Sequence, residues 1–554
     1  MTKYIFITGG VVSSLGKGST SASIGMLLER RGLTVRLQKL DPYINLYRNL
    51  LSPAQQGEIY VLDDGTAADI DLGHYERFTN ARLNKNSSWT TGQIYQHVFE
   101  KERIGSYNGT AVQVIPHITD EIKCCLSLQA GPAVDVVITE IGGTVGDIES
   151  LPHLEAIRQF SLEAGKENVL YIHLTLIPFL KAAKEIKTKP TQHSVGLLRQ
   201  IGIQPDILIC RTSVSISKEE RTKIGLFCNV DAKSVIEEKD KEFSIYEIPL
   251  CLAENKLDRL IIKKLNIENV KPLVLEDWYE LIDRIRKPEH TLNVAVVGEY
   301  AEHPGAYNST LEALEHAGIA ERTQIHITRI PSETVLQEDV QKTLLKQDAV
   351  ILSGGPGESE IEGKIKTVQI ARENGIPFLG INLGMHCAVI EFARNVLLLN
   401  DAHSAEYEPR TKQPVICRSE KLSEKGLKTG TDTVVLTANS PASPRGEQQT
   451  KIQFAYGGQP LVFERFRHQF EFNEQYSELF EAGNIVLSAN SADGISVYGV
   501  ELPEHPWFAA VQFHPEFKSK PVKPHPLFTA LIAAALRLCS EKSSSSDTKT
   551  KYCS

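Results

Sequence analysis

The fold of this protein is decided by residues 4–19, which read YIFITGGVVSSLGKGS. The first five of these residues are β-branched or aromatic and predict a strand, which breaks into a glycine-rich turn before a helix. The glycines let backbone N–H groups converge, the helix start adds the positive end of its dipole, and Lys17 neutralises phosphate charge. The stretch predicts a triphosphate site in a doubly wound α/β domain; the alternative is a glycine-rich connector in another such sheet.

The spacing of this turn departs from the strict P-loop pattern. Five residues rather than four separate Gly10 from Gly16. Gly18 stands where a serine or threonine metal ligand is expected, and Ser19 comes one place late.

Length and composition restrict the classes of function. The 554 residues suffice for two or three cores, and 41% hydrophobic with 23% charged residues is ordinary for a globular protein. A net charge of −9 offers no basic surface for nucleic acid, so we expect small ligands. The most apolar stretch, residues 169–180, is too short to span a bilayer, and no basic leader precedes the first strand. We expect a cytoplasmic protein without membrane partners, whose nine scattered cysteines are free thiols.

The next elements place a second strand beside the phosphate turn. Residues 21–31 have helical periodicity, and residues 34–40 predict a strand. By the crossover rule this is a βαβ unit with a parallel sheet, whose ligands collect at the carboxyl ends of the strands. Lys39 stands at such an end.

Carboxylates then accumulate along the chain. Residues 63–78 are dense in acidic side chains, which suit Mg²⁺ beside phosphates but equally suit a solvated loop. The run 134–139 predicts a buried strand that delivers Glu140 to its carboxyl end. Because P-loop proteins hold their metal on such a residue, Glu140 favours the magnesium interpretation.

A lysine-rich segment predicts a second polyanion site. It follows a predicted strand at residues 169–176, and in an extended loop Lys187 and Lys189 would project to one side with Thr188 and Gln192. The alternative is a solvated charged face. Arg211 is expected at the end of a further strand, residues 206–210, and residues 221–223 open a helix.

The second half of the chain predicts another α/β domain. Lys287 and Pro288 halt a helix, and a new strand begins at Leu292. We therefore predict two doubly wound domains with mainly parallel sheets: residues 1–270, a linker at 271–291, residues 292–539, and a disordered tail at 540–554.

Taken together, the motifs resemble the CTP synthase family over the whole chain except the tail. The second half of the chain resembles the class I glutamine amidotransferase domain of that family. The stretches that carry the resemblance are Gly9–Gly18, Lys39–Asn45, Asp71–Phe78, Val112–Thr119, Glu140–Pro152, Lys187–Val195 and Leu226–Val230.

The resemblance implies an amidoligase that uses ATP and Mg²⁺ to phosphorylate the 4-oxygen of UTP, after which ammonia attacks C4 and gives CTP. It implies catalytic roles for Lys17 and Lys39 and metal ligation by Asp71 and Glu140. The implied ATP-binding residues are Ser14, Leu15, Gly16, Lys17, Gly18, Ser19, Asp71 and Arg211. The implied residues for UTP and the feedback inhibitor CTP are Ser13, Asp147, Ile148, Glu149, Lys187, Thr188, Lys189, Gln192 and Lys223.

The second half departs from the family's pattern at its nucleophile. The family's G-x-C-x-G turn is Gly380–Gly384 here, with Asn382 at the cysteine position. An amide cannot be deprotonated to attack glutamine, so His514 and Glu516 have nothing to activate. Cys387, five residues along a helix, is turned well away and is no obvious substitute.

Other departures fall nearby. Pro356 interrupts the oxyanion segment, and the implied glutamine-binding positions are Gly355, Glu406 and Gln469, the last replacing an arginine. The lid-like stretch of the family is not recognisable between Gly426 and Gln453. Residues 46–56 depart from the family's loop, and Gln56 replaces the histidine at the gate of its ammonia tunnel.

Four hypotheses remain at the sequence level. The favoured one is a CTP synthase that uses free ammonia, with UTP, ATP and CTP as ligands and a homotetrameric assembly implied by the family. The others are a glutamine-dependent CTP synthase with an unconventional nucleophile, a non-catalytic paralogue that binds nucleotides and co-assembles, and another P-loop amidoligase.

Overall fold

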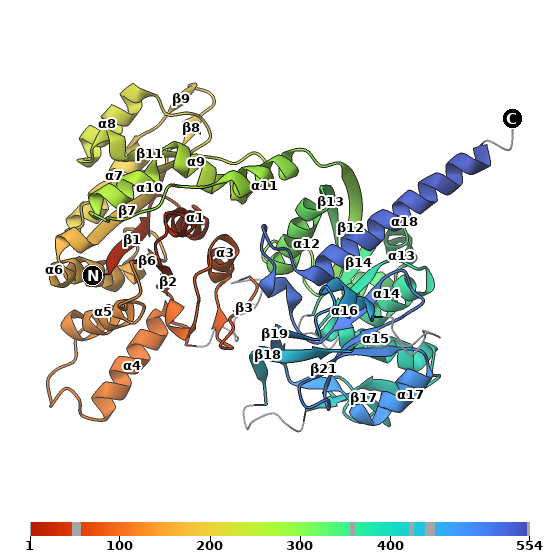
Figure 1. The fold of residues 1–554 in the computed structure, drawn as a ribbon. Coiled ribbons are helices and arrows are strands. Elements are labelled where there is room, and N and C mark those ends of the chain that lie inside the picture. The colour runs from red at the N-terminus through yellow and green to blue at the C-terminus, as the bar shows by residue number, and fades with distance from the viewer. Residues whose placement is uncertain (1, 47–56, 355–360, 420–425, 438–448, 551–554) are drawn as a thin grey trace. The chain divides into compact units, whose positions relative to one another are not determined.

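The computed structural model describes residues 2–46, 57–354, 361–419, 426–437 and 449–550, with side chains as far as residue 542. The chain divides into two compact units (Figure 1). Unit 1 comprises Met1–Leu50 and Ala68–Ile282, and unit 2 comprises Leu51–Ala67 and Asp283–Ser554. No helix within the described ranges is long and apolar enough to cross a membrane.

Unit 1 is built on a parallel sheet of seven strands. In spatial order these are β11 (Val235–Lys239), β10 (Ile207–Thr212), β7 (Val169–Leu176), β1 (Lys3–Gly9), β6 (Val136–Ile141), β2 (Val35–Asp41) and β5 (Ser88–Thr90). The chain leaves β1 for β2 but later inserts β6 between them, so the order reverses at β1. Ligands of doubly wound sheets bind at such a switch point, beyond the carboxyl ends of the strands.

The predicted first strand forms because its apolar residues are buried on both faces. Ile5, Phe6 and Ile7 are fully buried in β1, as expected for a parallel strand covered on two sides. The α-helices of unit 1 are α1 (Lys17–Arg30), α3 (Ile70–Phe78), α4 (Thr91–Arg103), α5 (Thr119–Ser127), α6 (Leu151–Ala164), α7 (Lys189–Gln200), α8 (Lys218–Cys228), α9 (Ile248–Glu254), α10 (Leu257–Lys264) and α11 (Glu276–Arg286). Helix α1 packs with α3, α9 and α10, whereas α4, α5 and α6 share a separate core with Phe6.

Unit 2 contains a nine-stranded sheet whose first five strands are parallel and whose other strands are antiparallel. Their order is β13 (Thr323–Pro331), β12 (His290–Gly298), β14 (Ala349–Leu352), β15 (Phe378–Ile381), β23 (Phe508–Val511), β22 (Val497–Glu501), β21 (Val486–Ser491), β18 (Lys428–Leu436) and β19 (Leu461–His468). The prediction of two α/β domains with mainly parallel sheets is confirmed.

Alternating residues of β14 show how helices cover both faces of this sheet. Val350 and Leu352 belong to one buried cluster, and Ala349 and Ile351 belong to the other. The helices of unit 2 are α12 (Asn308–Ala320), α13 (Glu338–Leu344), α14 (Ile361–Glu373), α15 (Leu383–Asn395), α16 (Lys451–Ala455), α17 (Ser477–Ala482) and α18 (Pro526–Thr550). A smaller sheet contains β16 (Ala402–Ser404), β17 (Gln413–Arg418) and β20 (Phe470–Phe472).

The limits of the two units differ from the predicted domain limits. Residues 57–67 pack with unit 2, although they precede most of unit 1 in the chain. They contain β3 (Tyr60–Val61) and lead into β4 (Ala67–Ala68), which pairs with it. Helix α11 lies within the predicted linker. Trp278 of this helix is buried against Tyr246 and Phe78 of unit 1. Helix α18 continues through residues 540–550, where the sequence predicts a disordered tail.

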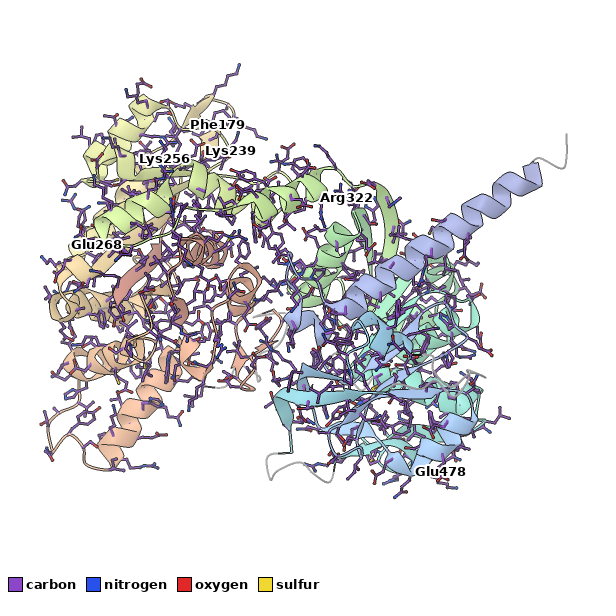
Figure 2. All side chains as sticks on the ribbon, in the orientation of Figure 1. Phe179, Lys239, Lys256, Glu268, Arg322 and Glu478 are labelled. Atoms are coloured by element: carbon purple, nitrogen blue, oxygen red, sulfur yellow. The ribbon has the colours of Figure 1, made fainter. Side chains whose placement is uncertain are left out.

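The lysine-rich segment differs from its predicted conformation. A short hairpin of β8 (Phe179–Leu180) and β9 (Glu185–Ile186) precedes it (Figure 1), and its first residue, Phe179, is labelled in Figure 2. Lys189 is the first residue of α7, with Thr188 as its N-cap and Pro190 in its first turn. Proline with its fixed φ suits the start of a helix, so the extended loop expected to align Lys187 and Lys189 does not form.

Candidate functional site

The glycine-rich turn joins β1 to an open helix N-terminus. Gly16 is the N-cap of α1 with φ 90°, and within the described chain no side chain caps that end. Val11 and Ser14 also have positive φ values of 78° and 55°. Non-glycine residues rarely adopt such values, and they concentrate at functional loops. Uncapped N–H groups and the helix dipole at such an end are suited to an anion.

Lys17 lies across the turn. Its Nζ donates a hydrogen bond to the Gly143 carbonyl at 3.0 Å, and a Cβ on Gly9 would lie 2.8 Å from its Cδ. Val145 N–H donates to the Gly9 carbonyl at 2.8 Å. The loop that follows β6 and contains Asp147 and Glu149 is therefore bound to the phosphate turn.

Lys39 lies among three aspartates at the end of β2. Its Nζ is 3.3 Å from Asp41, 3.0 Å from Asp69 and 2.5 Å from Asp71. Burial alone lowers the pKa of Lys39, but these carboxylates and Glu140 outweigh it and hold the pKa well above its usual value. Lys39 therefore carries a permanent positive charge beside the phosphate turn.

The position of Asp71 explains why Gly18 stands where the P-loop pattern has a serine or threonine. Asp69 caps α3 by accepting a hydrogen bond from Asp71 N–H at 3.0 Å. A Cβ on Gly18 would lie 2.3 Å from Asp71 Oδ1. Gly18 thus leaves room for a carboxylate where the strict motif places a serine or threonine.

Glu140 is buried at the end of β6 and accepts a hydrogen bond from Tyr75 Oη at 2.6 Å. Burial and the neighbouring charge of Asp71 raise the pKa of Glu140 to about 7. Two such carboxylates suit Mg²⁺, which takes one or two protein carboxylates together with phosphate oxygens. Among the described residues there is no group of three or more histidine, cysteine or acidic side chains that could hold a metal ion.

Arg211 links the turn to a cavity. Its Nη1 donates to the Leu15 carbonyl at 2.7 Å, and its Nε donates to Asp240 at 3.2 Å. The sequence predicted Arg211 just beyond a strand at residues 206–210. In the structure β10 continues to Thr212, so Arg211 lies within the strand. A cavity of about 240 Å³ adjoins it, lined by Ser19, Arg211, Asp240, Phe243 and Ile245 among others.

His173 and Ser194, for which the sequence predicted no role, connect the lysine-rich segment to the glycine-rich turn. His173 bonds Thr8 Oγ1 and Ser194 Oγ, both at 2.9 Å. A Cβ on Gly10 would lie 1.7 Å from Ser194 Oγ, so the turn and α7 are in close contact. Burial first, and then the charge of Lys17, lowers the pKa of His173 to about 3, which keeps it neutral.

The other predicted polyanion-binding side chains lie around α7. Lys187 pairs with Glu185, and Lys189 Nζ lies 6.0 Å from the Phe227 ring centroid. Gln192 donates to Thr188 Oγ1 at 3.0 Å. Lys223 lies on α8, which packs against α7.

The structure thus brings Lys17, Lys39, Asp71 and Glu140 together as the sequence predicts. Tyr75, Asp69 and the His173–Ser194 pair were missed. Tyr75 was missed because only the carboxylates of the acidic stretch were considered as metal ligands, and Asp69 was missed because the family resemblance singled out Asp71 in that stretch. The pairing of His173 with Ser194 has no local sequence signal.

Unit 2 contains a sharp turn between β15 and α15, with Asn382 at its centre. Asn382 has φ 52° and ψ −105°, a conformation that non-glycine residues rarely adopt. A Cβ on Gly384 would lie 2.2 Å from the Leu352 carbonyl, and one on Gly380 would lie 2.8 Å from the Gly384 carbonyl. This close approach of backbones forms the strand-turn-helix geometry that presents a nucleophile in other enzymes.

The Asn382 amide is fully hydrogen-bonded. Its Nδ2 donates to His514 Nε2 and to the Arg467 carbonyl, both at 3.1 Å. Gln512 Nε2 donates to Asn382 Oδ1 at 2.8 Å, and His514 Nδ1 donates to Glu516 at 2.7 Å. The nitrogen of His514 that would act as a base therefore already accepts an amide proton.

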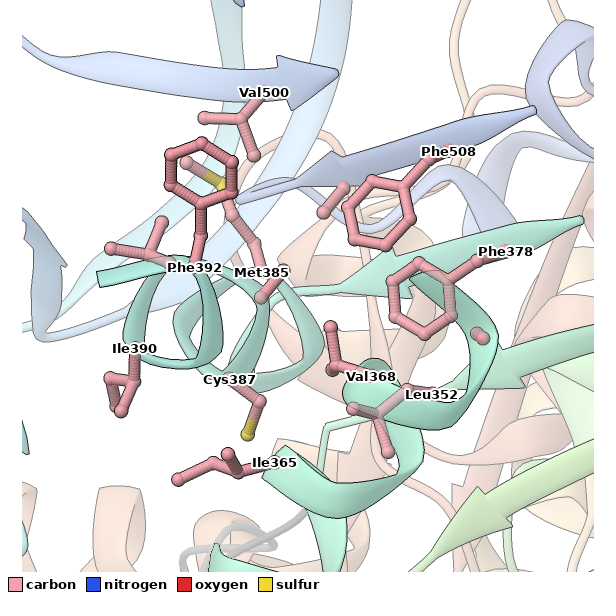
Figure 3. Close-up of a cluster of buried hydrophobic side chains, with 14 of the residues drawn as sticks. Leu352, Ile365, Val368, Phe378, Met385, Cys387, Ile390, Phe392, Val500 and Phe508 are labelled. Atoms are coloured by element: carbon pink, nitrogen blue, oxygen red, sulfur yellow. The ribbon is translucent and has the colours of Figure 1, made fainter. Parts of the chain in front are cut away.

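Cys387 does not replace the missing nucleophile. It is fully buried within a hydrophobic cluster that includes Leu352, Ile365 and Ile390 (Figure 3). Burial raises the pKa of its thiol to about 12. Because the thiolate is the reactive form, Cys387 is chemically inert.

The predicted glutamine-binding positions are separated along the chain. Glu406 follows β16, and its N–H donates to Ser404 Oγ at 3.2 Å. Gln469 follows β19, and its carbonyl accepts a hydrogen bond from Ser419 N–H at 3.3 Å. Gly355, Pro356 and most of the segment 46–56 lie outside the described residues, as does part of the 426–453 stretch.

Two family models match the chain. Residues 3–267 match "CTP synthase N-terminus", and residues 304–534 match "Glutamine amidotransferase class-I". Together with the phosphate turn and the sharp turn at Asn382, these matches define an amidoligase joined to a glutaminase-type unit.

Curated relatives match over nearly the full length. The chain is 51% identical over 539 residues to the CTP synthase of Caldanaerobacter subterraneus subsp. tengcongensis, covering 97% of this chain and 99% of the relative. It is 49% identical over 539 residues to the CTP synthase of Geobacillus kaustophilus, covering 97% and 100%. A solved Trypanosoma brucei CTPS glutaminase domain with bound acivicin is 31% identical and covers 44% of this chain and 94% of its own, with a TM-score of 0.41. The chain belongs to the CTP synthase family.

Proposed function

We propose that this protein aminates UTP to CTP with ATP and free ammonia, and that its glutaminase half-reaction is inactive. The observation that carries the proposal is the state of Asn382. Its hydrogen-bonded amide occupies both the nucleophile position and the acceptor nitrogen of His514, whereas the charged groups of unit 1 are in place.

In the proposed reaction the γ-phosphoryl group of ATP is transferred to the 4-oxygen of UTP. Ammonia then adds to C4, and inorganic phosphate leaves with that oxygen. Phosphorylation is needed because an oxide is a poor leaving group and phosphate is a good one. The turn between Gly10 and Gly16, the start of α1 and Lys17 bind the ATP phosphates. Arg211 and the adjoining cavity bind the adenine end.

Lys39 neutralises the charge that builds up on the transferring phosphoryl group, which requires a fixed cation. Asp71 and Glu140 would hold Mg²⁺, which supplies Lewis-acid charge neutralisation when it is bound. Burial first, and then the charge of Asp71, raises the pKa of Glu140. What supports the assignment of a cation is the carboxylate chemistry of the two residues, which suits Mg²⁺.

For the second nucleotide we propose the residues around α7. Lys187, Thr188, Lys189, Gln192 and Lys223 would bind the triphosphate of UTP. Ser13, Asp147, Ile148 and Glu149 would recognise the pyrimidine nucleotide and CTP as a feedback ligand. We further propose the family's homotetrameric assembly, with the synthetase in unit 1 and the glutaminase-type domain in unit 2.

The test is CTP formation by the purified protein with UTP, ATP and Mg²⁺, comparing ammonium chloride with glutamine as the nitrogen source. We expect CTP from ammonium only, and we expect Lys17→Ala to abolish it. CTP from glutamine at a similar rate would refute the assignment of Asn382. CTP from neither source would instead favour a nucleotide-binding subunit without catalytic activity.

A further inference from the structure

Within unit 1, helix α7 packs on strand β7 through two pairs of polar side chains. His173 Nε2 lies 2.9 Å from Ser194 Oγ, and Thr175 Oγ1 donates a hydrogen bond to Thr191 Oγ1 at 3.0 Å. All four side chains are buried. His173 and Thr175 are two residues apart on a strand, and Thr191 and Ser194 are three residues apart on a helix, so each two share a face of their element. Two buried hydrogen bonds therefore hold the same helix on the same strand.

His173 extends this contact to β1 and to the glycine-rich turn. It is the register partner of Thr8 in β1, and its Nδ1 lies 2.9 Å from Thr8 Oγ1. Thr8, His173 and Ser194 thus form a hydrogen-bonded bridge between β1 and α7, the histidine bridge. A Cβ on Gly10 would lie 3.0 Å from His173 Cε1 and 1.7 Å from Ser194 Oγ. The turn can pass against this bridge only because residue 10 has no side chain.

A neutral imidazole is suited to the histidine bridge. It carries one donor nitrogen and one acceptor nitrogen, and His173 uses both of them, toward Thr8 and Ser194. Burial first, and then the charge of Lys17, lowers the pKa of His173 to about 3, so the ring keeps this form at neutral pH. Because the ring is rigid, it sets both the length and the direction of the bridge.

The histidine bridge also fixes the start of α7. Ser194 is the sixth residue of this helix, and Lys189 is the first. Five residues of an α-helix span about 7 to 8 Å along its axis, and helices curve little over such a length. The N-cap Thr188 and Lys189 are therefore held at a set distance from Gly10, and all of these residues belong to unit 1.

We infer that His173 and Ser194 are positioning residues for phosphoryl transfer, which hold the start of α7 at a fixed distance from the glycine-rich turn. The inference rests on the proposed function, in which the turn binds the ATP phosphates and the start of α7 binds the UTP triphosphate. It deepens that function, because it assigns the relative position of the two nucleotides to residues that are assigned to neither. Group transfer requires reacting atoms about 3 to 3.5 Å apart, and a misplacement of about 1 Å can lower the rate about 100-fold.

The experiment uses four variants of the full chain. Ser194→Ala and His173→Asn break the histidine bridge, because alanine has no hydroxyl and the shorter asparagine side chain cannot reach Ser194. His173→Gln is the conservative variant, because its amide extends to about the position of Nε2. Thr175→Val is the matched control: it removes the other hydrogen bond between β7 and α7, and Thr191 keeps its bond to a backbone carbonyl.

Three quantities are measured for each variant. They are kcat for ammonia-dependent CTP formation, the Kd of MgATP and of UTP measured singly, and hydrogen exchange of residues 189–195 in the apo protein. The two Kd values separate a positioning role from a binding role, because the histidine bridge contacts neither nucleotide in the proposal. Exchange of α1 in the same sample reports whether unit 1 remains folded.

We expect Ser194→Ala and His173→Asn to lower kcat by about tenfold or more, while each Kd stays within about twofold of the wild-type value. Exchange across residues 189–195 should increase in both. His173→Gln should recover part of these effects, Thr175→Val should keep a kcat close to that of the wild type, and α1 should stay protected in every variant.

A kcat for Ser194→Ala equal to that of Thr175→Val would overturn the inference, and so would a weaker Kd for one nucleotide with an unchanged kcat. If the wild type makes no CTP from ammonia, the proposed function fails instead. The exchange measurement still decides whether the histidine bridge orders the start of α7, and unchanged exchange of residues 189–195 in His173→Asn would show that it does not.

Discussion

Replacing Asn382 by cysteine should create a reactive thiolate beside His514. The backbone of the turn already has the conformation of a nucleophile position, with φ 52° and ψ −105°. His514 remains oriented by Glu516 at 2.7 Å. The new Sγ would lie about 4 Å from His514 Nε2, and an ion pair at that distance is worth about 4 kcal/mol at the effective dielectric constant of a protein site.

An interaction of this size corresponds to roughly three pKa units. Partial desolvation opposes it, so we expect a pKa of about 6 to 7 for the new thiol, compared with about 8.5 for a free cysteine. The substitution also removes three hydrogen bonds of the Asn382 amide. At about 1 kcal/mol for each bond, the protein should lose up to about 3 kcal/mol of stability.

The assay is the rate of alkylation by iodoacetamide as a function of pH, in a background with the exposed Cys124 replaced by serine. Cys387 serves as an internal control, because its buried thiol has its pKa raised to about 12 and should not react. A reactive thiol with a pKa at or above 8.5 would refute the inference that His514 and Glu516 keep a catalytic geometry. Glutamine hydrolysis by the variant is the second readout, and its absence despite a reactive thiol would implicate Gln469 and the other departures in the glutamine pocket.

Two further outcomes follow from unit 1. Gly18→Ala should abolish CTP formation, because its Cβ would lie 2.3 Å from Asp71 Oδ1 and displace that carboxylate from Lys39. The gain of about 1 kcal/mol in helix propensity opposes this clash, so we expect no net stabilisation. Activity and thermal unfolding are measured together, and an active variant would contradict the role of Asp71. Burial lowers the pKa of His173 from 6.5 to about 3, so the unfolded chain binds the extra proton between these values and stability should fall with decreasing pH by about 1.4 kcal/mol for each unit below 6.5. His173→Gln should flatten this slope by one proton in urea unfolding of unit 1 between pH 7 and 4.5, and an unchanged slope would refute the assignment.

Local sequence patterns were sufficient to predict the strands that carry the two sites. The run of apolar residues before Gly9 and the turn before Lys17 each reflect interactions within a few residues, so β1 and α1 appear where they are expected. The same holds for Asn382, because the turn between β15 and α15 is formed by neighbouring glycines. Lys189 was predicted to lie in an extended loop. The structure places it at the start of α7, because Pro190 favours the first turn of a helix.

The family, the two α/β folds and the identity of the charged groups could therefore be predicted from residue order. Which of those groups touch became known only from the folded chain. The contact of Asp71 with Gly18 and the anchoring of Asp63 by Arg465 join residues that are far apart in the chain. Such contacts depend on how helices and strands pack, and packing has no periodic signature in a single sequence. For the same reason, the assignment of residues 57–67 to unit 2 could be made only from the folded chain.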